Sequence, residues 1–413
     1  MKKILTILIS LMSFNVFGND NIYNEKCFQK WIVDFKIEAV KKHKIKKDVL
    51  DYSFKNIHYI DEVIRLDNFQ PEFNKSFYEY IDNALTKKRI KEGNFNLQNY
   101  KTLLKNVYNE FGIPPEIIIS FWGLETYYGK IRGEFNIIES LASLAYSSRR
   151  KDFFKRELIF ALKILNARDM TNSQLYGSWA GAFGHFQFMP STFTTYAIDG
   201  NNDGFKNLTG DIMDAMYSAG NYLSKMGWNN KFPWGVEVFF DVKISGIWKL
   251  ADKDEWLPLK EFLDAGVKIK NGKKYPLDAK VKLIAPVGCD GETFLVFENF
   301  KYIMNWNNSV NYALAVGLLS DAIKENKVPA VTNPKNRIIV KTFSHNEIKK
   351  VQKRLKELNF YDGEETGFYG KVTAKAVRSF QKSLSKKSMF YKTGKDIIVD
   401  GFLSVDLYNE LFN

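Results

Sequence analysis

The chain has 413 residues, of which 45% are hydrophobic and 15% aromatic. This content supports packed cores and excludes a chain that is disordered throughout. The formal net charge of +13 favours an anionic partner.

The first eighteen residues, MKKILTILISLMSFNVFG, have the order of a cleaved secretory signal. Lys2 and Lys3 precede an apolar run that ends at Phe14, and small residues follow. The sequence therefore predicts a signal peptide over residues 1–18 and export to the periplasm. A retained N-terminal anchor is the alternative, although the apolar run is short for a bilayer. A lipoprotein is disfavoured because Cys27 lies well past that run.

No later segment approaches eighteen consecutive apolar residues, so no membrane span is expected after signal cleavage. In the periplasm, an anionic partner would be cell-wall glycan with acidic peptides, or an anionic membrane face, rather than nucleic acid. Cys27 and Cys289 are the only cysteines. They could form one disulfide in that oxidising compartment or remain free, and the sequence leaves both open.

Helical spacing of apolar residues dominates the first half of the chain. It predicts several short helices from Lys30 to Glu92, broken at Gln70–Pro71, and a second helical block over residues 97–128. In that block Pro115 suits a first helical turn, so we expect a helix from Pro115 to Gly129. Further helices are predicted over residues 138–146, 149–167 and 211–226. The stretch between them, residues 177–203, is rich in Gly, Ser and Asn and is predicted to be loop.

The pattern changes at Pro233 to short runs such as VEVFF, KLIAP and TFLVF, which predict a small strand-containing insertion over about residues 233–300. Helix resumes over residues 309–325. Residues 326–341 are predicted to be a linker because they include Pro329 and Pro334. The remaining residues, 342–413, are enough for a small domain. From Arg337 to the end there are 15 basic and 9 acidic residues, which indicates a binding module for an anionic ligand.

The stretch FWGLETYYG, residues 121–129, contains one carboxylate, Glu125. On the expected helix Ile118, Trp122 and Glu125 share one face. Burial and the negative end of the helix dipole both disfavour the charged form, so we expect the pKa of Glu125 to be raised. A carboxyl group that stays protonated near neutral pH can act as a general acid. The alternative, a Glu that reaches solvent or a buried arginine, is the better-supported interpretation on this pattern alone.

Three further runs of sequence favour the catalytic interpretation of Glu125: WGLETYYGKIRGEFNIIESLASLAYSSRR, GSWAGAFGHFQFMPSTFTTYAID and NYLSKMGW. Together they resemble the B-type lytic murein transglycosylases, glycoside hydrolase family 103. The resemblance extends over residues 28–322, and APVGCDGETFLVFENF and NWNNSVNYALAVGLL match the C-terminal half of the family. It implies a mainly α, lysozyme-like catalytic domain over residues 19–325.

The resemblance also implies that Glu125 is the single catalytic carboxylate. It would protonate the bond between N-acetylmuramic acid and N-acetylglucosamine and then, as a base, activate the 6-hydroxyl of the muramic sugar to give a 1,6-anhydro end. An ordinary glycosidase needs a second carboxylate at a defined distance. Glu134, Glu139 and Asp152 lack a comparable apolar setting. No cofactor is required for this chemistry.

Other positions match residues that line the family's substrate groove. The two arginines among them suit the lactyl or peptide carboxylates of the substrate. For each residue the alternative is a purely structural role in packing or turn formation. The predicted substrate-binding residues are Ser178, Gln187, Arg149, Arg150, Tyr222, Asn307 and Tyr312.

The chain departs from the family at two places. His185 and Phe186 stand where a Gly and small polar residues are usual, and Trp306 stands where a Tyr is common. Neither departure involves the acid, but both could alter which saccharide subsites are filled.

The segment DGNNDGF, residues 199–205, matches the start of a calcium loop. The acid expected at the twelfth position is missing, because Gly210 lies there. In the resembling family the last ligand would fall on Asp214, after one extra residue. The candidate ligands of a structural calcium are Asp199, Asn201, Asp203 and Asp214. A polar turn closed by side-chain hydrogen bonds explains the segment equally well without an ion.

The C-terminal segment from IKKVQKRLKELNFYDG onward resembles the peptidoglycan-binding type 1 domain, a small three-helix fold. Its second half carries an insertion, KKSMFYKTGKD. The predicted function is therefore a periplasmic lytic transglycosylase that acts on peptidoglycan glycan strands, with cell-wall synthesis or division proteins as further candidate partners. A muramidase that uses water and a non-catalytic wall-binding scaffold are the alternatives.

Overall fold

The structure is a computed structural model that describes residues 18–69, 76–253, 255–289, 291–333, 341–388, 390–392 and 395–412. The predicted signal peptide up to residue 17, the predicted break at Gln70–Pro71 and residues 334–340 of the predicted linker lie outside this range. Within it, the fold is mainly helical, as the sequence predicts. None of the described helices is both long enough and apolar enough to cross a membrane.

The chain divides into two compact units. The first contains the residues up to Phe69 together with Arg132–Thr195 and Phe205–Gly210. The second contains Gln70–Ile131, Tyr196–Gly204 and the chain from Asp211 onward. Each unit is described by itself.

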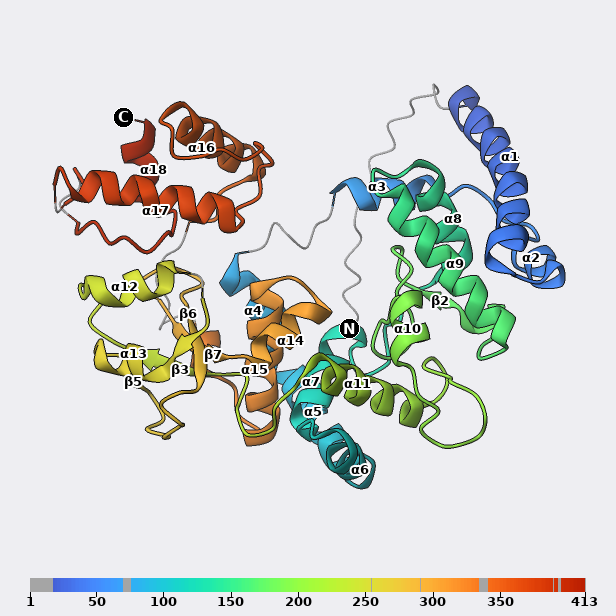
Figure 1. The fold of residues 1–413 in the computed structure, drawn as a ribbon, viewed down its shortest axis with the longest axis horizontal. Coiled ribbons are helices and arrows are strands. Elements are labelled where there is room, and N and C mark those ends of the chain that lie inside the picture. The colour runs from blue at the N-terminus through green and yellow to red at the C-terminus, as the bar shows by residue number, and fades with distance from the viewer. Residues whose placement is uncertain are drawn as a thin grey trace, which may run out of the picture. The chain divides into compact units, whose positions relative to one another are not determined.

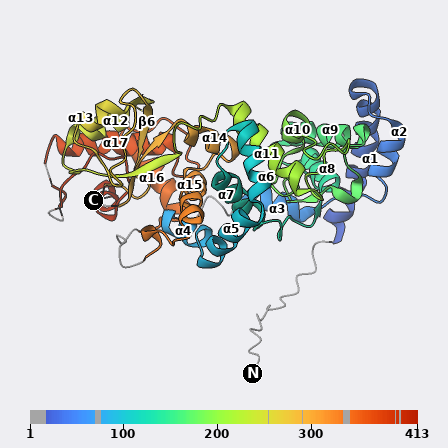
Figure 2. The same ribbon diagram turned by 90° about the horizontal axis from the view of Figure 1, so that it is seen from below.

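Helices dominate the first unit. Its elements are α1 (Gly18–His43), α2 (Lys47–Ser53), α3 (Asp61–Phe69), β1 (Phe135–Asn136), α8 (Ile137–Ser147), α9 (Lys151–Ala167), the short 3-10 helix η2 (Asn172–Gln174), β2 (Tyr176–Gly177) and nearly all of α10 (Pro190–Tyr196). Helices α8 and α9 lie side by side (Figures 1 and 2) and bury Leu141, Leu144, Leu158 and Leu162 between and around them. The helices predicted over residues 138–146 and 149–167 are therefore confirmed.

The prediction of loop throughout residues 177–203 is wrong at α10. Glu157 on α9 is buried, and its carboxylate accepts hydrogen bonds from the backbone N–H and the hydroxyl of Ser191, at 2.9 and 2.7 Å. An acid at a helix N-terminus satisfies donors that would otherwise lack partners. Helix α10 is thus stabilised by a residue that is distant in sequence.

The second unit begins with a helical bundle. Its helices are α4 (Phe77–Ala84), α5 (Lys87–Asn99), α6 (Lys101–Phe111), α7 (Pro115–Thr126), α11 (Ile212–Met226), α14 (Asn299–Trp306) and α15 (Val310–Glu325). Side chains of Ser76, Thr86, Asp211 and Ser309 accept hydrogen bonds from the first turns of α4, α5, α11 and α15. These caps explain why the helices begin where they do.

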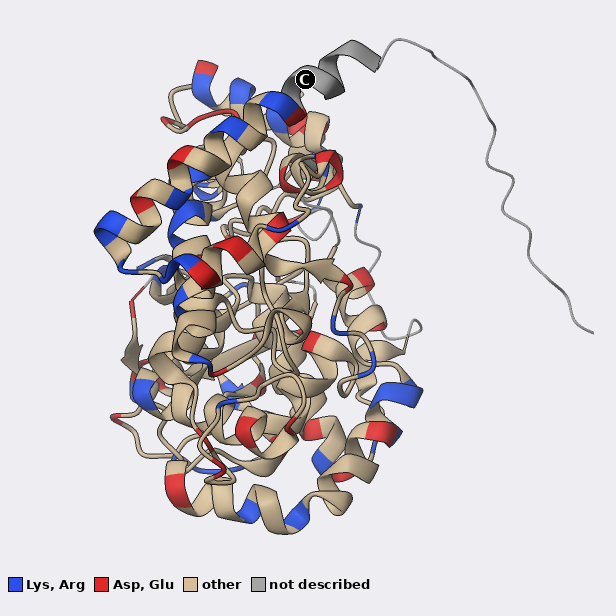
Figure 3. Ribbon diagram, turned by 90° about the vertical axis from the view of Figure 1, so that its right-hand side faces the viewer, with Lys and Arg blue, Asp and Glu red and all other residues tan. Residues whose placement is uncertain are grey.

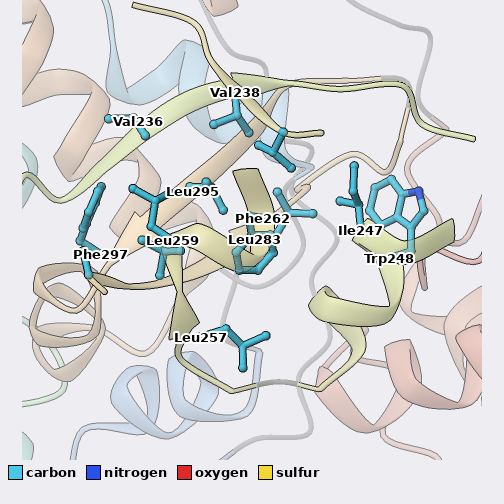
Figure 4. Close-up of a cluster of buried hydrophobic side chains, with 13 residues drawn as sticks. Val236, Val238, Ile247, Trp248, Leu257, Leu259, Phe262, Leu283, Leu295 and Phe297 are labelled. Atoms are coloured by element: carbon cyan, nitrogen blue, oxygen red, sulfur yellow. The ribbon is translucent and has the colours of Figure 1, made fainter. Parts of the chain in front are cut away.

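A five-stranded antiparallel sheet follows α11, as the strand pattern after Pro233 predicts. The strand order is β4 (Leu257–Pro258), β6 (Lys280–Ile284), β7 (Thr293–Phe297), β3 (Gly235–Phe239) and β5 (Lys268–Ile269). Two short helices that the sequence did not predict, α12 (Ser245–Asp252) and α13 (Leu259–Asp264), pack on it. Figure 4 shows Val236 and Val238 of β3 over Phe262 of α13, with Trp248 of α12 beside them.

The 3-10 helix η3 (Ala330–Thr332) precedes the C-terminal helices. These are α16 (His345–Glu357), α17 (Lys371–Ser385) and α18 (Val405–Phe412), and they enclose a core that includes Val351, Val377 and Leu407. In the view of Figure 3 basic and acidic positions are interspersed along the described helices. Cys27 and Cys289, whose pairing the sequence left open, do not form a disulfide in the structure.

Candidate active site

Glu125 lies in the last turn of α7. Pro115 begins this helix, as the sequence predicts, because its missing N–H costs nothing in a first turn. Ile118, Phe121 and Trp122 are buried, while Glu125 itself is half-buried. The carboxyl group therefore occurs at the edge of an apolar face, near the negative end of the helix dipole.

The helix ends at Thr126 rather than at Gly129, and this corrects the predicted boundary. Tyr127, Tyr128 and Gly129 have φ of +50°, +61° and +79°, so three consecutive residues adopt the left-handed conformation. For the two tyrosines this costs on the order of 1–3 kcal/mol each. The turn is held by hydrogen bonds from the Tyr128 N–H to the Trp122 carbonyl, at 3.2 Å, and from the Gly129 N–H to the Thr126 hydroxyl, at 3.0 Å.

The Tyr128 ring lies against the backbone of α7. A Cβ atom at position 123 would be 2.8 Å from the ring, so only Gly123 permits this approach. The Tyr128 hydroxyl donates to the Arg89 carbonyl oxygen at 2.7 Å, and burial raises the pKa of Tyr128. A strained turn directly after an acid is a reason to suspect function.

Tyr312, on the first turn of α15, donates its hydroxyl hydrogen to Oε1 of Glu125. Ser309 fixes this turn, because its hydroxyl accepts from the Tyr312 N–H. Tyr312 is only 4% exposed. The hydrogen bond from Ser120 to the Val316 carbonyl, at 2.7 Å, further ties α7 to α15. The predicted acid and one predicted substrate-binding residue are therefore in direct contact.

A group of aromatic rings adjoins this pair in the second unit. Trp306, at the end of α14, lies 4.5 Å from the Phe121 ring and 4.8 Å from the Tyr222 ring, centroid to centroid. Tyr222 on α11 also packs against Tyr196, at 4.9 Å, and burial raises its pKa to about 12. Asn307 is the residue at which α14 ends, and its N–H donates to the Ile303 carbonyl.

Ser178 belongs to the first unit. It opens a tight loop after β2, where its N–H donates to the Ala182 carbonyl at 2.7 Å and its hydroxyl accepts from the Ala182 N–H at 3.0 Å. The side chain therefore shapes its own loop.

Gln187 of the same unit has φ of +49°, unusual for a residue that is not glycine. Its side-chain amide donates to the carbonyls of Arg132 and Gly184, at 3.0 and 3.1 Å. Phe186, one of the departures from the family, is buried in the core of this unit. These contacts give Ser178 and Gln187 structural roles alongside the predicted ones.

Arg149 and Arg150 both face Asp67, which is fully buried. Arg150 binds it closely, with its guanidinium nitrogen 2.6 Å from Oδ1, and also lies over the rings of Phe153 and Phe154. The Arg149 Nε atom is 3.9 Å from Oδ2. Arg150 is thus committed to Asp67, whereas Arg149 is freer to meet a ligand.

The segment that begins at Asp199 forms a closed polar turn. The Asp199 carboxylate accepts from the N–H groups of Asp203 and Gly204, and Asn201 accepts from the Asp203 N–H. Asp214, which is fully buried, accepts from the Gly200 N–H at 2.8 Å. Within the described residues no group of three or more His, Cys, Asp or Glu side chains is arranged to hold a metal ion.

The region that contains these residues matches a known family: residues 27–321 match the transglycosylase SLT domain. The chain belongs to this family. Residues 344–385 match a peptidoglycan binding domain. The predicted resemblance to lytic transglycosylases is confirmed, and the chain is an enzyme of that class.

Known proteins that are similar to this chain agree with the family assignment. The Escherichia coli membrane-bound lytic murein transglycosylase B is 30% identical over 308 residues, which cover 69% of this chain and 80% of that protein. The crystal structure of Pseudomonas aeruginosa SltB3 in complex with NAG-NAM-pentapeptide aligns with a TM-score of 0.84 at 33% identity, over 93% of this chain and 99% of that one. Escherichia coli Slt35 in complex with calcium aligns with a TM-score of 0.61 at 28% identity, over 74% and 95%. The predicted fold class is confirmed.

Several residues near the candidate site were not predicted from the sequence. Asp67 was missed because nothing near it in the sequence marks it as the partner of Arg150. Trp306 was identified only as a departure from the family, yet its ring joins α7, α11 and α14. The basic residues around Tyr127 were also missed, although KKRIK at the start of α5 and Lys130 were visible as charges.

Glu139, one of the acids considered as a second carboxylate, has a structural role. It accepts from the His58 N–H at 2.9 Å, and its own N–H donates to the Asn136 side chain at the start of α8. It is therefore committed to linking helices within the first unit.

Proposed function

We propose that the chain cleaves the β-1,4 bond between N-acetylmuramic acid and N-acetylglucosamine in peptidoglycan without using water. The observation that carries the proposal is the half-buried Glu125 at the end of α7 with the Tyr312 hydroxyl donating to it. Membership of the transglycosylase family supports it. So does a second SltB3 crystal structure, which contains NAG-anhNAM-pentapeptide, an anhydro sugar.

In the first step, protonated Glu125 donates its proton to the glycosidic oxygen, which leaves as the 4-hydroxyl of N-acetylglucosamine. The carbonyl oxygen of the muramic acetamide bonds to C1 as the C1–O bond breaks, giving an oxazolinium ion beside the ionised carboxylate. Glu125 then removes the proton of the 6-hydroxyl, and O6 bonds to C1 while the acetamide oxygen leaves. The carboxyl group is protonated again, and the product ends in 1,6-anhydromuramic acid.

Tyr312 has a defined role in this scheme. Its hydroxyl stabilises the carboxylate between the two steps, since a hydrogen bond to a charged acceptor is stronger than one to a neutral acceptor. The apolar wall of Phe121 and Trp306 limits the access of water to the oxazolinium ion. The remaining proposed substrate-binding residues are Ser178, Gln187, Arg149, Arg150, Tyr222 and Asn307.

The mass of the products from purified peptidoglycan tests the proposal. Anhydro ends are expected from the wild type, and Glu125→Gln should solubilise no wall material. Products that are heavier by one water would instead identify a muramidase. Unchanged solubilisation by Glu125→Gln would remove the acid role, and no solubilisation by the wild type would favour a wall-binding scaffold.

The proposed organisation has a signal peptide over residues 1–18, a catalytic domain over residues 19–325, a linker over residues 326–341 and a peptidoglycan-binding domain over residues 342–413. The match of residues 344–385 to a peptidoglycan binding domain supports the last of these. Peptidoglycan as substrate and the signal pattern support a location in the periplasm. Sedimentation of a catalytically inactive chain with intact wall, compared with one that ends at residue 325, tests the role of the last domain.

The proposed catalytic steps do not involve calcium. The oxygen donors of Asp199, Asn201, Asp203 and Asp214 are of the type that calcium prefers, but the turn is closed by its own hydrogen bonds, and the Asn201 side-chain nitrogen faces Asp203. The present arrangement does not fit the ion without rearrangement. If calcium binds, added calcium should raise the unfolding temperature of the wild type but not of Asp203→Ala; equal curves with calcium and with a chelator would exclude it.

A further inference from the structure

Three cations surround one tyrosine ring in the second unit. The charged groups of Lys88 and Arg89, on the first turn of α5, lie 5.8 and 5.0 Å from the centre of the Tyr127 ring. Lys130, which follows α7, lies 5.4 Å from the same centre. Like charges repel, so such a cluster is unfavourable unless an anion balances it.

The acids in the described part of the chain balance only one of these charges. Lys130 pairs with Glu92 at 2.7 Å. Arg89 donates instead to the backbone carbonyls of Asn83 and Ala84, and burial lowers its pKa. No salt bridge to Lys88 occurs among the described residues. The cluster therefore keeps a surplus of about two positive charges, one of them on a guanidinium that is held in place by the backbone.

The cluster lies close to the proposed acid. Tyr127 is two residues after Glu125, and two trans peptide bonds place their Cα atoms at most about 7.6 Å apart. The left-handed conformation of Tyr127, with φ of +50°, fixes the direction in which the chain leaves the helix. Glu125 and the cluster therefore lie on consecutive parts of one turn, so a substrate bound at Glu125 has the cluster as a neighbouring cationic surface.

We infer that Lys88, Arg89, Lys130 and Tyr127 form a binding site for a carboxylate of the peptide stem attached to the muramic sugar. This inference rests on the proposed function. A pentapeptide joined through its amino end keeps a free C-terminal carboxylate, and SltB3 was crystallised with such a pentapeptide. Lysines supply mobile charges that can follow a flexible stem, while the ring supplies a flat apolar wall for its side chains. The site would make the enzyme prefer glycan that carries peptides over glycan from which they have been removed.

The test compares kcat/KM on two substrates: glycan strands with their peptides, and the same strands after an amidase has removed them. For Lys88→Glu we expect the ratio of the two values to fall about threefold to tenfold at low salt, with a smaller fall at high salt. Lys105→Glu is the matched control, because Lys105 is an exposed lysine of α6 and the substitution changes the net charge equally. Its ratio should equal that of the wild type.

A ratio that is unchanged in Lys88→Glu, or that falls equally in Lys105→Glu, would overturn the inference. If the wild type releases no anhydro product from either substrate, the proposed function fails instead. The binding site is then tested separately, by the Kd of the full chain for a soluble disaccharide pentapeptide. A Kd that rises about threefold or more in Lys88→Glu alone supports the site without turnover, and equal Kd values in all three chains contradict it.

Discussion

Replacing Tyr312 by Phe should move the pH dependence of turnover without disturbing the packing of the site. The substitution removes only the hydroxyl that donates to Glu125 and keeps the ring against Phe121. The ionised carboxylate is the better acceptor, so losing this donor makes ionisation less favourable. Glu125 should then keep its proton to a higher pH.

The size of the shift follows from the environment. A hydrogen bond to a charged group contributes about 1.5–3 kcal/mol. Since Tyr312 is only 4% exposed, water has little room to replace its hydroxyl. One pH unit corresponds to about 1.4 kcal/mol, so the alkaline limb of the kcat/KM profile should move upward by about one to two units. The maximal rate should fall, because a more weakly acidic carboxyl group is a poorer proton donor.

The assay is the initial rate of anhydro-end release from purified peptidoglycan across the acid to alkaline range. Tyr222→Phe is the matched control, since it removes a buried tyrosine hydroxyl from a ring that packs against Trp306. It should change KM and leave the alkaline limb in place. A Tyr312→Phe profile that coincides with the wild type, or moves to lower pH, would refute the reasoning.

Two further predictions concern stability. Arg150→Ala should destabilise the chain by about 3–5 kcal/mol in urea unfolding, because Asp67 would be buried without its close partner. Arg149→Ala should cost less than about 1 kcal/mol. Equal losses in the two variants would contradict the conclusion that Arg150 is the main partner of Asp67. Asp321 accepts from the Trp234 indole N–H at 3.0 Å, and desolvation of its carboxyl raises its pKa to about 6. The stability that it contributes is therefore present at pH 4 and lost as the pH rises through 6. Asp321→Asn should have the same stability as the wild type at pH 4. At pH 8 it should be more stable by about 1 kcal/mol, a figure that is reduced because solvent screens the carboxylate. A gain of the same size at both pH values would show that the titration is not its cause.

Helices with strong local signals could be predicted from the sequence. The helix predicted over residues 211–226 is α11, from Ile212 to Met226. Asp211 accepts from the first turn, and Gly227, with φ of +110°, ends the helix. Apolar spacing and both end signals agreed here, so the boundaries were found within one residue.

Helix α10 shows why local signals are insufficient elsewhere. It has seven residues, and its start depends on the buried carboxylate of Glu157, 34 positions earlier in the chain. Helices this short are marginal without tertiary contacts. A pattern rich in Gly, Ser and Asn therefore predicted loop, and the long-range contact that overrides it was not visible in the sequence.

The same limit applies to the candidate site. Glu125 could be identified because a lone acid in an aromatic run is unusual and because the run resembles a known family. The partners that decide its chemistry lie on other helices, such as Tyr312, which is 187 residues away. Each of these residues could be identified in the sequence, but the contact between them could not be predicted from it.

The end of α7 shows how a wrong boundary bears on function. Had the helix continued to Gly129, as predicted, Tyr128 would have lain three residues beyond Glu125 on nearly the same face of the helix. Instead, the left-handed turn after Thr126 folds the Tyr128 ring back onto Gly123 and leaves Tyr127 among Lys88, Arg89 and Lys130. The strained turn thus gives the two tyrosines different positions, which a regular helix would not have done. Tyr128 packs against the helix that carries the acid, and Tyr127 faces the cations beside it.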